Sequence, residues 1–208
     1  MMKNILFIGG SAGIGLAAVQ KLQGNSIFVA SRTHENLAGL DAAHIPFDAA
    51  SGELDISSLP ETLDGFVYCP GSINLKPFKS LKPEHFEADL QLNFIGIVKV
   101  LQQILPKLLK SKQASAVFFS TVAVQNGMPF HTSVAASKGA IEGFARALAA
   151  EYAPKIRVNV IAPSLTDTPL AEKLLNNDAK REKSAERHPL KRVGRPEDIA
   201  AMVQFLLS

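Results

Sequence analysis

Short apolar runs alternate with longer amphipathic stretches along this chain. Runs of three to six residues predict six strands, at Lys3–Ile8, Ser26–Ala30, Ile45–Phe47, Gly65–Cys69, Ala116–Ser120 and Ile156–Ile161. Continuous apolar runs of this length are typical of parallel strands that are buried on both faces. The pattern therefore favours a parallel sheet over a half-exposed antiparallel one.

Helical periodicity fills the stretches between these runs. A helix is predicted over Ala12–Gln23, and another over Thr132–Tyr152. From Pro83 onward, apolar side chains recur at helical spacing, at Phe86, Leu90, Phe94, Ile97, Leu101, Leu105 and Leu108. Alternating strands and helices predict an α/β sheet with right-handed crossovers. The polar, irregular stretch 163–189, with Leu170, Leu174 and Leu175 on one short helix, is interpreted as a lid over a site.

Composition narrows the class of protein. The 208 residues, 47% hydrophobic and 20% charged, predict a single folded domain over 1–208. A single cysteine, Cys69, excludes a disulfide framework and a cysteine-rich zinc site, and no metal is expected. No signal peptide and no run of membrane-spanning length is found, so a cytoplasmic location is expected. The net charge of +3 comes from scattered basic residues, which argues against nucleic acid as a partner.

A glycine-rich turn separates the first strand from the first helix. Glycines let the backbone turn tightly and approach a phosphate, and the helix N-terminus offers free N–H groups and a positive dipole end. Strand, turn and helix follow in the order that a dinucleotide site requires. The predicted cofactor contacts here are Gly9, Ser11, Gly13, Ile14 and Gly15. The alternative is a plain glycine turn without a ligand.

Several motifs, in order along nearly the whole chain, resemble the short-chain dehydrogenase/reductase family. They are the turn Ile8–Gly15 and the stretches Leu92–Gly96, Ser137–Ala140, Ile156–Pro163, Asp167–Pro169 and Pro189–Ala200. The resemblance implies a Rossmann-like, doubly wound parallel sheet of strand order 3-2-1-4-5-6, with helices on both faces and the substrate site built from the C-terminal loops. It also implies a homodimer or homotetramer that pairs the two long helices across a two-fold axis.

The residues after the second strand indicate which nucleotide is bound. Ser31 stands where an acidic residue would favour NAD, and Arg32 can pair with the 2′-phosphate of NADP. A solvated surface arginine is the alternative. Asp48 resembles the family's adenine-contacting aspartate, although a turn residue would look the same. The remaining cofactor contacts implied by the resemblance are Gly71, Pro163 and Thr168.

The catalytic residues that the resemblance implies are only partly present. Lys138 stands at the lysine position, where it would hold the nicotinamide ribose, but Val134 replaces the proton-donating tyrosine four residues earlier. Thr121 occupies the serine position and can still donate a hydrogen bond. Asn93 matches the asparagine that holds a relay water, or it is a satisfied asparagine in a kinked helix. His131, seven residues before Lys138, is the hypothetical proton donor, because an enoyl-reductase branch places its tyrosine at that spacing; a helix-capping or surface histidine is the alternative.

Two functions from different classes follow. The first is an NADP(H)-dependent oxidoreductase that transfers a hydride to or from a carbonyl, alcohol or enoyl substrate with an atypical proton donor. The second is a catalytically silent nucleotide-binding or assembly protein on the same fold. The sequence ends at Phe205–Ser208, before the further strand that family members usually carry, so that either the protein is naturally short or its tail is lacking here. In both cases we expect one side of the substrate pocket and a common subunit contact to be absent from these residues.

Overall fold

The computed structural model describes residues 2–50 and 52–208 and contains one parallel sheet of six strands. The strand order is β3-β2-β1-β4-β5-β6, as the resemblance implied. In chain order the strands are β1 (Asn4–Ile8), β2 (Ser26–Ser31), β3 (Ala42–Pro46), β4 (Gly65–Tyr68), β5 (Ala114–Phe119) and β6 (Ile156–Ile161). The order reverses between β1 and β4, and an open α/β sheet binds its ligands at such a point.

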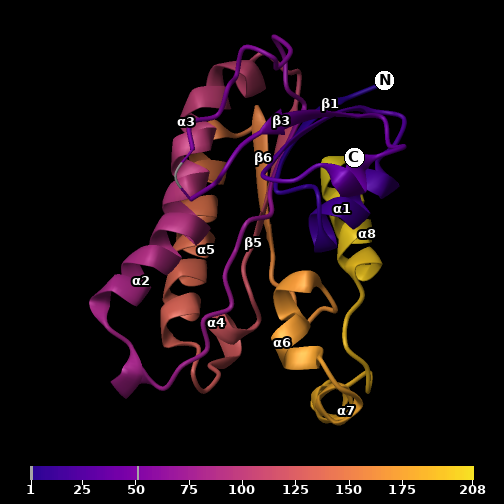
Figure 1. Ribbon diagram of the computed structural model, residues 1–208. Helices are drawn as coiled ribbons and strands as arrows, with labels where there is room; N and C mark the ends of the chain where they lie inside the picture. The colour runs from indigo at the N-terminus through magenta and orange to yellow at the C-terminus, as the bar shows by residue number, and fades with distance from the viewer. Residues whose placement is uncertain (1, 51) are drawn as a thin grey trace.

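Helices cover both faces of this sheet (Figure 1). In chain order they are α1 (Gly13–Lys21), α2 (Pro83–Leu90), α3 (Gly96–Leu109), α4 (Ala123–Asn126), α5 (Thr132–Tyr152), α6 (Glu172–Leu175), α7 (Asp178–Glu186) and α8 (Pro196–Leu207). Helices α1 and α8 pack together on one face, while α2, α3 and α5 cover the other. Helices α4, α6 and α7 lie near the edge where the parallel strands end (Figure 1).

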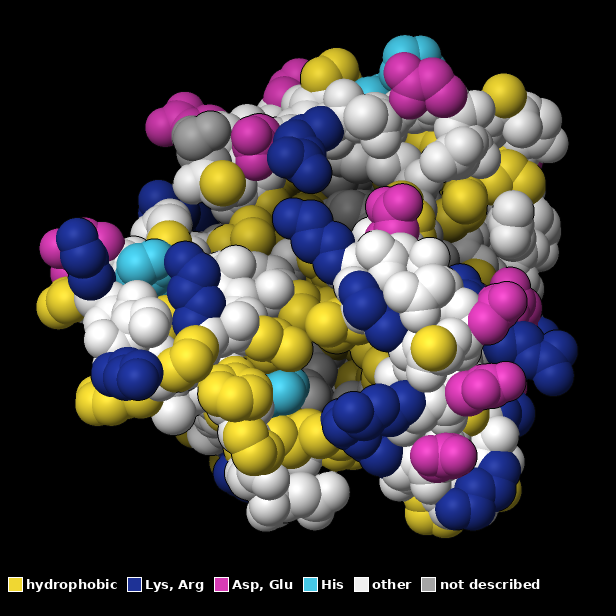
Figure 2. Space-filling view, turned by 60° about the horizontal axis from the view of Figure 1, so that its bottom comes forward, with side chains coloured by type: hydrophobic (Ala, Val, Ile, Leu, Met, Phe, Trp, Pro, Cys, Tyr) yellow, Lys and Arg dark blue, Asp and Glu magenta, His cyan; other side chains and the backbone are white. Residues whose placement is uncertain are grey.

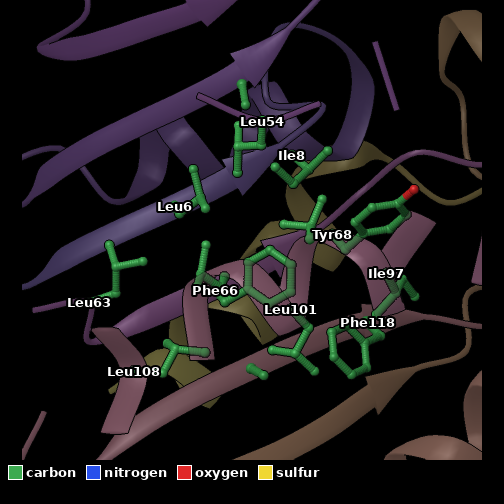
Figure 3. Close-up of a cluster of buried hydrophobic side chains, with 14 of the residues drawn as sticks. Leu6, Ile8, Leu54, Leu63, Phe66, Tyr68, Ile97, Leu101, Leu108 and Phe118 are labelled. Atoms are coloured by element: carbon green, nitrogen blue, oxygen red, sulfur yellow. The ribbon is translucent and has the colours of Figure 1, made fainter. Parts of the chain in front are cut away.

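Alternate residues of each strand supply two separate cores. Leu6, Phe66 and Phe118 face α3 and α5, whereas Ile5 and Phe7 face α1 and α8. Figure 3 shows the first core, in which side chains of the strands meet those of α3. Because both faces are covered, the strands are apolar throughout, which is why they read as continuous runs in the sequence.

Several predicted boundaries were wrong by a few residues. The helix predicted over Ala12–Gln23 is α1, which ends at Lys21 because Gly24 turns the chain with a φ of +93°. The third strand is Ala42–Pro46 and not Ile45–Phe47. The prediction began too late because the first residues of the strand are small or polar and carry no apolar signal. The strand lies at the edge of the sheet. The remaining differences are that β1 starts at Asn4, β2 runs on to Ser31, β4 stops at Tyr68 and β5 covers Ala114–Phe119.

The long helix that begins at Pro83 is interrupted. Five residues, Gln91–Ile95 (η3), form a π-helical turn between α2 and α3. The whole helical stretch 83–109 is long and apolar enough to cross a membrane, although no run of spanning length was expected from the sequence. In the structure its residues Ile97, Leu101 and Leu108 are buried in the first core, so it is a core helix here.

Candidate active site

The turn between β1 and α1 depends on glycine at three positions. Gly9 and Gly13 have φ angles of +79° and +53°, which side chains rarely adopt. A Cβ on Gly15 would lie 2.4 Å from the carbonyl oxygen of Gly9, so no side chain fits there. The Leu16 N–H donates to the carbonyl of Ala12, the first residue before α1, and the residues of the turn line the cavity in front of this helix N-terminus. This cradle suits a phosphate.

A cavity of about 1240 Å³ opens at the carboxyl edge of the sheet. Its wall contains every cofactor contact that the sequence predicts: Gly9, Ser11, Gly13, Ile14, Gly15, Ser31, Arg32, Asp48, Gly71, Lys138, Pro163 and Thr168. Residues that are far apart in the chain thus meet at one surface. A Cβ on Gly13, for instance, would lie 3.3 Å from Thr168, which brings the loop after β6 against the glycine turn.

One end of the cavity is organised around the loop after β2. The buried Ser31 hydroxyl donates to the carbonyl of Thr33 at 2.7 Å, and the hydroxyls of Ser11 and Thr33 lie 3.1 Å apart. Arg32 is exposed and lines the cavity. Asp48 uses one carboxylate oxygen to accept the Ala50 N–H at 2.9 Å, so it forms the turn foreseen as its alternative while also lining the cavity. An arginine without a carboxylate beside it suits a phosphate group.

Lys138 lies deep in the wall, on α5. Its ammonium donates to the Phe119 carbonyl at 2.9 Å. Burial lowers the pKa of Lys138 to about 8, although Cys69 and Asp89 act in the opposite direction. A Cβ added to Gly71 would lie 3.3 Å from the Lys138 Nζ, so the backbone after β4 passes close to the amine. Lys138 is therefore held rigidly at the cavity floor.

Asn93 stands behind the cavity wall and not in it. It lies in the π turn and is fully buried. Its amide Nδ2 donates to the hydroxyls of Ser72 and Ser137, both at 3.0 Å, and its Oδ1 accepts the Ser72 N–H at 3.3 Å. Its hydrogen bonds are satisfied within the protein, as its alternative interpretation expects, and the helix is interrupted here by a π turn. From this turn the side chain reaches Ser137 of α5.

The other predicted catalytic side chains line the cavity above Lys138. Val134 is buried and presents only methyl groups there. Thr121 accepts the Ala123 N–H at 3.3 Å, which leaves its hydroxyl proton available for a ligand. His131 places Nδ1 2.7 Å from the Pro129 carbonyl. A carbonyl can only accept, so the proton is on Nδ1, and no partner of Nε2 is found among the described residues.

Neither tyrosine of the chain replaces the missing proton donor. The buried Tyr68 donates its hydroxyl to the Leu92 carbonyl, 2.8 Å away, in the π turn. Tyr152 closes the far end of α5, and neither residue lines the cavity. Cys69 does line it, but burial raises the pKa of its thiol to about 12, so it is not a thiolate nucleophile.

Three polar groupings around the cavity are absent from the sequence-based prediction. The buried carboxylate of Asp89 accepts from Ser72, Asn74 and Ser133, and joins α2 to α5. The other two groupings are Glu142, which accepts from Ser120 at 2.6 Å and from Gln125, and Ser164, whose hydroxyl lies 2.6 Å from the Nε2 of His188. Their partners are 15 to 44 residues apart in sequence, so no local spacing announces them.

The stretch 163–189 also proves to be part of the cavity. Residues of the 3₁₀ turn Pro169–Ala171 and of the short helices α6 and α7 line the opening, among them Leu170 and Leu174, whereas Leu175 is buried. Within residues 2–50 and 52–208, no group of three or more His, Cys, Asp or Glu side chains gathers as a metal site requires. The wall offers groups that can bind a phosphate, several hydroxyls and the amine of Lys138.

A parallel sheet of this order, with a glycine turn and a cavity at its carboxyl edge, defines a Rossmann-like α/β protein. The family described as "Enoyl-(Acyl carrier protein) reductase" matches residues 10–208. The chain is 30% identical to a 3-oxoacyl-[acyl-carrier-protein] reductase of Thermotoga maritima, over 99% of this chain and 90% of the relative. It is 28% identical to an acetoacetyl-CoA reductase of Allochromatium vinosum, over 99% and 91%. The fold matches that of an aldohexose dehydrogenase from Thermoplasma acidophilum, with a TM-score of 0.89, 24% identity and coverage of 100% and 87%.

The chain therefore belongs to the short-chain dehydrogenase/reductase family. The enzymes of this family are oxidoreductases that use nicotinamide cofactors. The resemblance seen in the sequence motifs is confirmed at the level of the family and the fold.

Proposed function

We propose that this protein is an NADP(H)-dependent oxidoreductase that acts on a carbonyl, alcohol or enoyl substrate and uses an atypical proton donor. The observation that carries the proposal is the gathering of the whole predicted set of cofactor contacts on one cavity wall, with Lys138, Thr121 and His131 beside them. Two of the relatives named above are called a 3-oxoacyl-[acyl-carrier-protein] reductase and an acetoacetyl-CoA reductase, and these names support a reductive reaction. The working unit proposed is the single domain 1–208, in the cytoplasm.

The residues present fit a nicotinamide dinucleotide. The glycine cradle and the N-terminus of α1 suit its pyrophosphate, Arg32 suits a 2′-phosphate, and the Lys138 amine suits ribose hydroxyls. NADP(H) is preferred over NAD(H) because Ser31 puts no carboxylate at the end of β2 and Arg32 follows it. The bound cofactor would supply or accept a hydride.

The chain's own residues then have to hold the substrate and manage one proton. In a reduction, the carbonyl carbon gains a hydride and its oxygen gains a proton as the C=O π bond breaks. The Thr121 hydroxyl can donate a hydrogen bond to that oxygen. His131, once protonated, carries a proton on Nε2 that it can transfer, while its Nδ1–H stays on the Pro129 carbonyl.

A second histidine of the cavity is less suited to this role. In His188, Nδ1 lies 2.7 Å from the Ser184 carbonyl and Nε2 lies 2.6 Å from the Ser164 hydroxyl. Both ring nitrogens are therefore engaged within the protein. His131 has one nitrogen left for a substrate, which is why we assign the proton to His131.

One observation favours a different class of function. Val134, an apolar and buried residue, stands at the position where the family usually has its proton-donating tyrosine. A catalytically silent nucleotide-binding or assembly protein of the same fold would tolerate this residue. The two functions differ in turnover and not in cofactor binding.

The deciding experiment follows NADPH oxidation with a panel of carbonyl and enoyl substrates that includes 3-oxoacyl thioesters. The proposed oxidoreductase oxidises NADPH with at least one of them. NADPH binding without turnover across the panel would favour the silent nucleotide-binding function, and failure to bind NADPH would exclude the proposed oxidoreductase. Calorimetry measures that binding separately.

The proton donor is tested by His131→Phe, with His188→Phe as the matched control. We expect His131→Phe to lower kcat by roughly 10² to 10⁴, the usual contribution of a general acid, with NADPH affinity unchanged. The control should change kcat by less than about tenfold, because both ring nitrogens of His188 have partners within the segment 163–189. Full turnover in His131→Phe would eliminate this residue as the donor.

A further inference from the structure

The charges on the cavity wall are strongly unequal. Among the described residues that line it, the only carboxylate is that of Asp48. The cationic side chains on the wall are Arg32, Lys138, Lys173, Lys180, Lys183 and Arg187. The proposed function gives a role to Arg32 and Lys138 at the cofactor. The other four cations, all on the segment that contains α6 and α7, have no role in it.

Helix α7 separates its charges by face. At about 100° per residue, positions i, i+3 and i+7 fall on one side of a helix and positions i, i+4 and i+8 on another. The first set is Lys180, Lys183 and Arg187, and all three line the cavity. The second set is Asp178, Glu182 and Glu186, and none of them lines it. The helix thus turns positive charge toward the cavity and negative charge away from it.

The protein does not neutralise the charges that face the cavity. The Lys180 ammonium donates to the Lys173 carbonyl at 3.0 Å and to the Asn176 side-chain oxygen at 2.8 Å, both of which are neutral acceptors. None of the ion pairs found in the described part of the chain includes Lys180, Lys183 or Arg187. By contrast, Arg181, which does not line the cavity, is paired with Asp167 at 2.6 Å.

Apolar side chains lie at the same opening. Met128 and Leu170 are 43% and 54% exposed and line the cavity, and Leu174 lines it beside them. Figure 2 shows the hollow lined by hydrophobic side chains, with lysine and arginine side chains at its rim. Exposed apolar surface beside unpaired cations is typical of a site for a ligand that has both characters.

We propose that the substrate is an organic anion with an apolar body, and that α7 is its anion-binding element. Lys180, Lys183 and Arg187 hold a carboxylate or phosphate of the substrate, and its apolar part lies against Met128 and Leu170. The reacting carbon then extends inward from this anchor. This step rests on the proposed function, because it extends the same cavity from cofactor to substrate class.

The cofactor's own phosphates are the competing ligand for these cations. Other elements already provide for those phosphates, namely the glycine cradle for the pyrophosphate and Arg32 for the 2′-phosphate. The two assignments differ in what is lost when α7 is neutralised. If α7 binds the substrate, neutralising it weakens binding of the substrate anion. If α7 binds the cofactor, neutralising it weakens binding of NADP⁺.

The test compares three six-carbon probes by calorimetry, with and without NADP⁺: hexanoate, hexyl phosphate and hexan-1-ol. We expect the anions to bind at least about tenfold more tightly than the alcohol, since hydrogen bonds to charged groups each contribute on this scale. The preference between hexanoate and hexyl phosphate distinguishes a carboxylate from a phosphate. In the double variant Lys180→Gln, Lys183→Gln, the affinity for the preferred anion should fall about tenfold or more.

The matched control is Glu182→Gln, Glu186→Gln, which changes the same number of charges on the opposite face of the same helix. It should leave anion affinity within about twofold, because charges that face solvent are screened. Equal binding of the three probes overturns the proposal, and so does a lysine variant that loses NADP⁺ affinity while keeping anion affinity. These measurements need no turnover. A protein that reduces neutral carbonyls without preferring anions would therefore lose this inference and keep the proposed function.

Discussion

Arg32 is the residue on which the proposed choice of NADP(H) depends. Its guanidinium is exposed at the end of β2 and lines the cavity beside Ser31. We expect Arg32→Ala to weaken NADPH binding by about 1.5–3 kcal/mol, the usual contribution of a hydrogen bond to a charged group. NADH, which lacks the 2′-phosphate, should bind both proteins equally. Calorimetry with the two nucleotides decides, and equal loss for NADH would mean that Arg32 acts on another part of the cofactor.

Lys138 makes a second prediction at this scale, about stability and pH. Burial lowers its pKa from 10.5 to about 8 in the folded protein, so the unfolded chain binds the proton more tightly. The cost to folding is present in full below pH 8, fades as the pH rises toward 10.5, and is absent above it. The effect of Lys138→Met on the free energy of unfolding should therefore be more favourable at pH 7 than at pH 10.5, by about 3 kcal/mol.

Urea unfolding of both proteins at the two pH values measures this difference. The comparison between pH values removes the constant effect of losing the hydrogen bond to Phe119. A difference between the two proteins that does not change with pH would contradict a lowered pKa for Lys138.

At the scale of elements, the π turn between α2 and α3 requires glycine at its exit. A Cβ on Gly96 would lie 2.1 Å from the Tyr68 hydroxyl and 3.3 Å from the Ala49 carbonyl. We expect Gly96→Ala to lower the free energy of unfolding by roughly 3 kcal/mol, because both neighbours are fixed and the core cannot expand freely. Thermal or urea unfolding measures the loss.

Gly139→Ala on α5 is the control for this prediction. Its Cβ would meet only Val124, at 3.7 Å, which is ordinary contact. The gain in helix propensity should then make this variant neutral or more stable, by up to about 1 kcal/mol. Combining Gly96→Ala with Tyr68→Phe should cost less than the sum of the two, since the clashing oxygen is gone. Additive losses would contradict the clash.

Elements differ in how far the sequence could predict them. The turn Gly9–Gly15 was predictable because its glycines, strand and helix are neighbours in sequence. Strand β3 was misplaced because Ala42 and Ala43 carry no apolar signal, and the π turn at Asn93 has the periodicity of an ordinary helix. The Asp89 and Ser164–His188 groupings were missed for another reason: their partners meet only when β4, α2, α5 and the segment 163–189 have packed together.

At the scale of the whole molecule, the sequence-based prediction of a homodimer or homotetramer still awaits its test. Helices α3 and α5 cover one face of the sheet, and side chains such as Leu105 and Leu148 on them are only partly buried. Pairing of these helices with those of a second copy would complete their burial. We expect light scattering at micromolar concentration to give at least twice the 22.3 kDa of one chain. A mass of 22.3 kDa across the micromolar range would contradict this assembly.

The hydrogen bond from Tyr68 to the π turn also has an optical consequence. The chain has no tryptophan and only two tyrosines, so any phenolate absorbance at alkaline pH comes from Tyr68 and Tyr152. Burial raises the pKa of the Tyr68 phenol above its usual value, and this ring stays un-ionised in alkaline solution for as long as the turn holds it. Phenolate absorbance from Tyr68 would therefore mark the point at which the π turn separates from β4, so this ring reports by absorbance on the packing of that helix against the sheet.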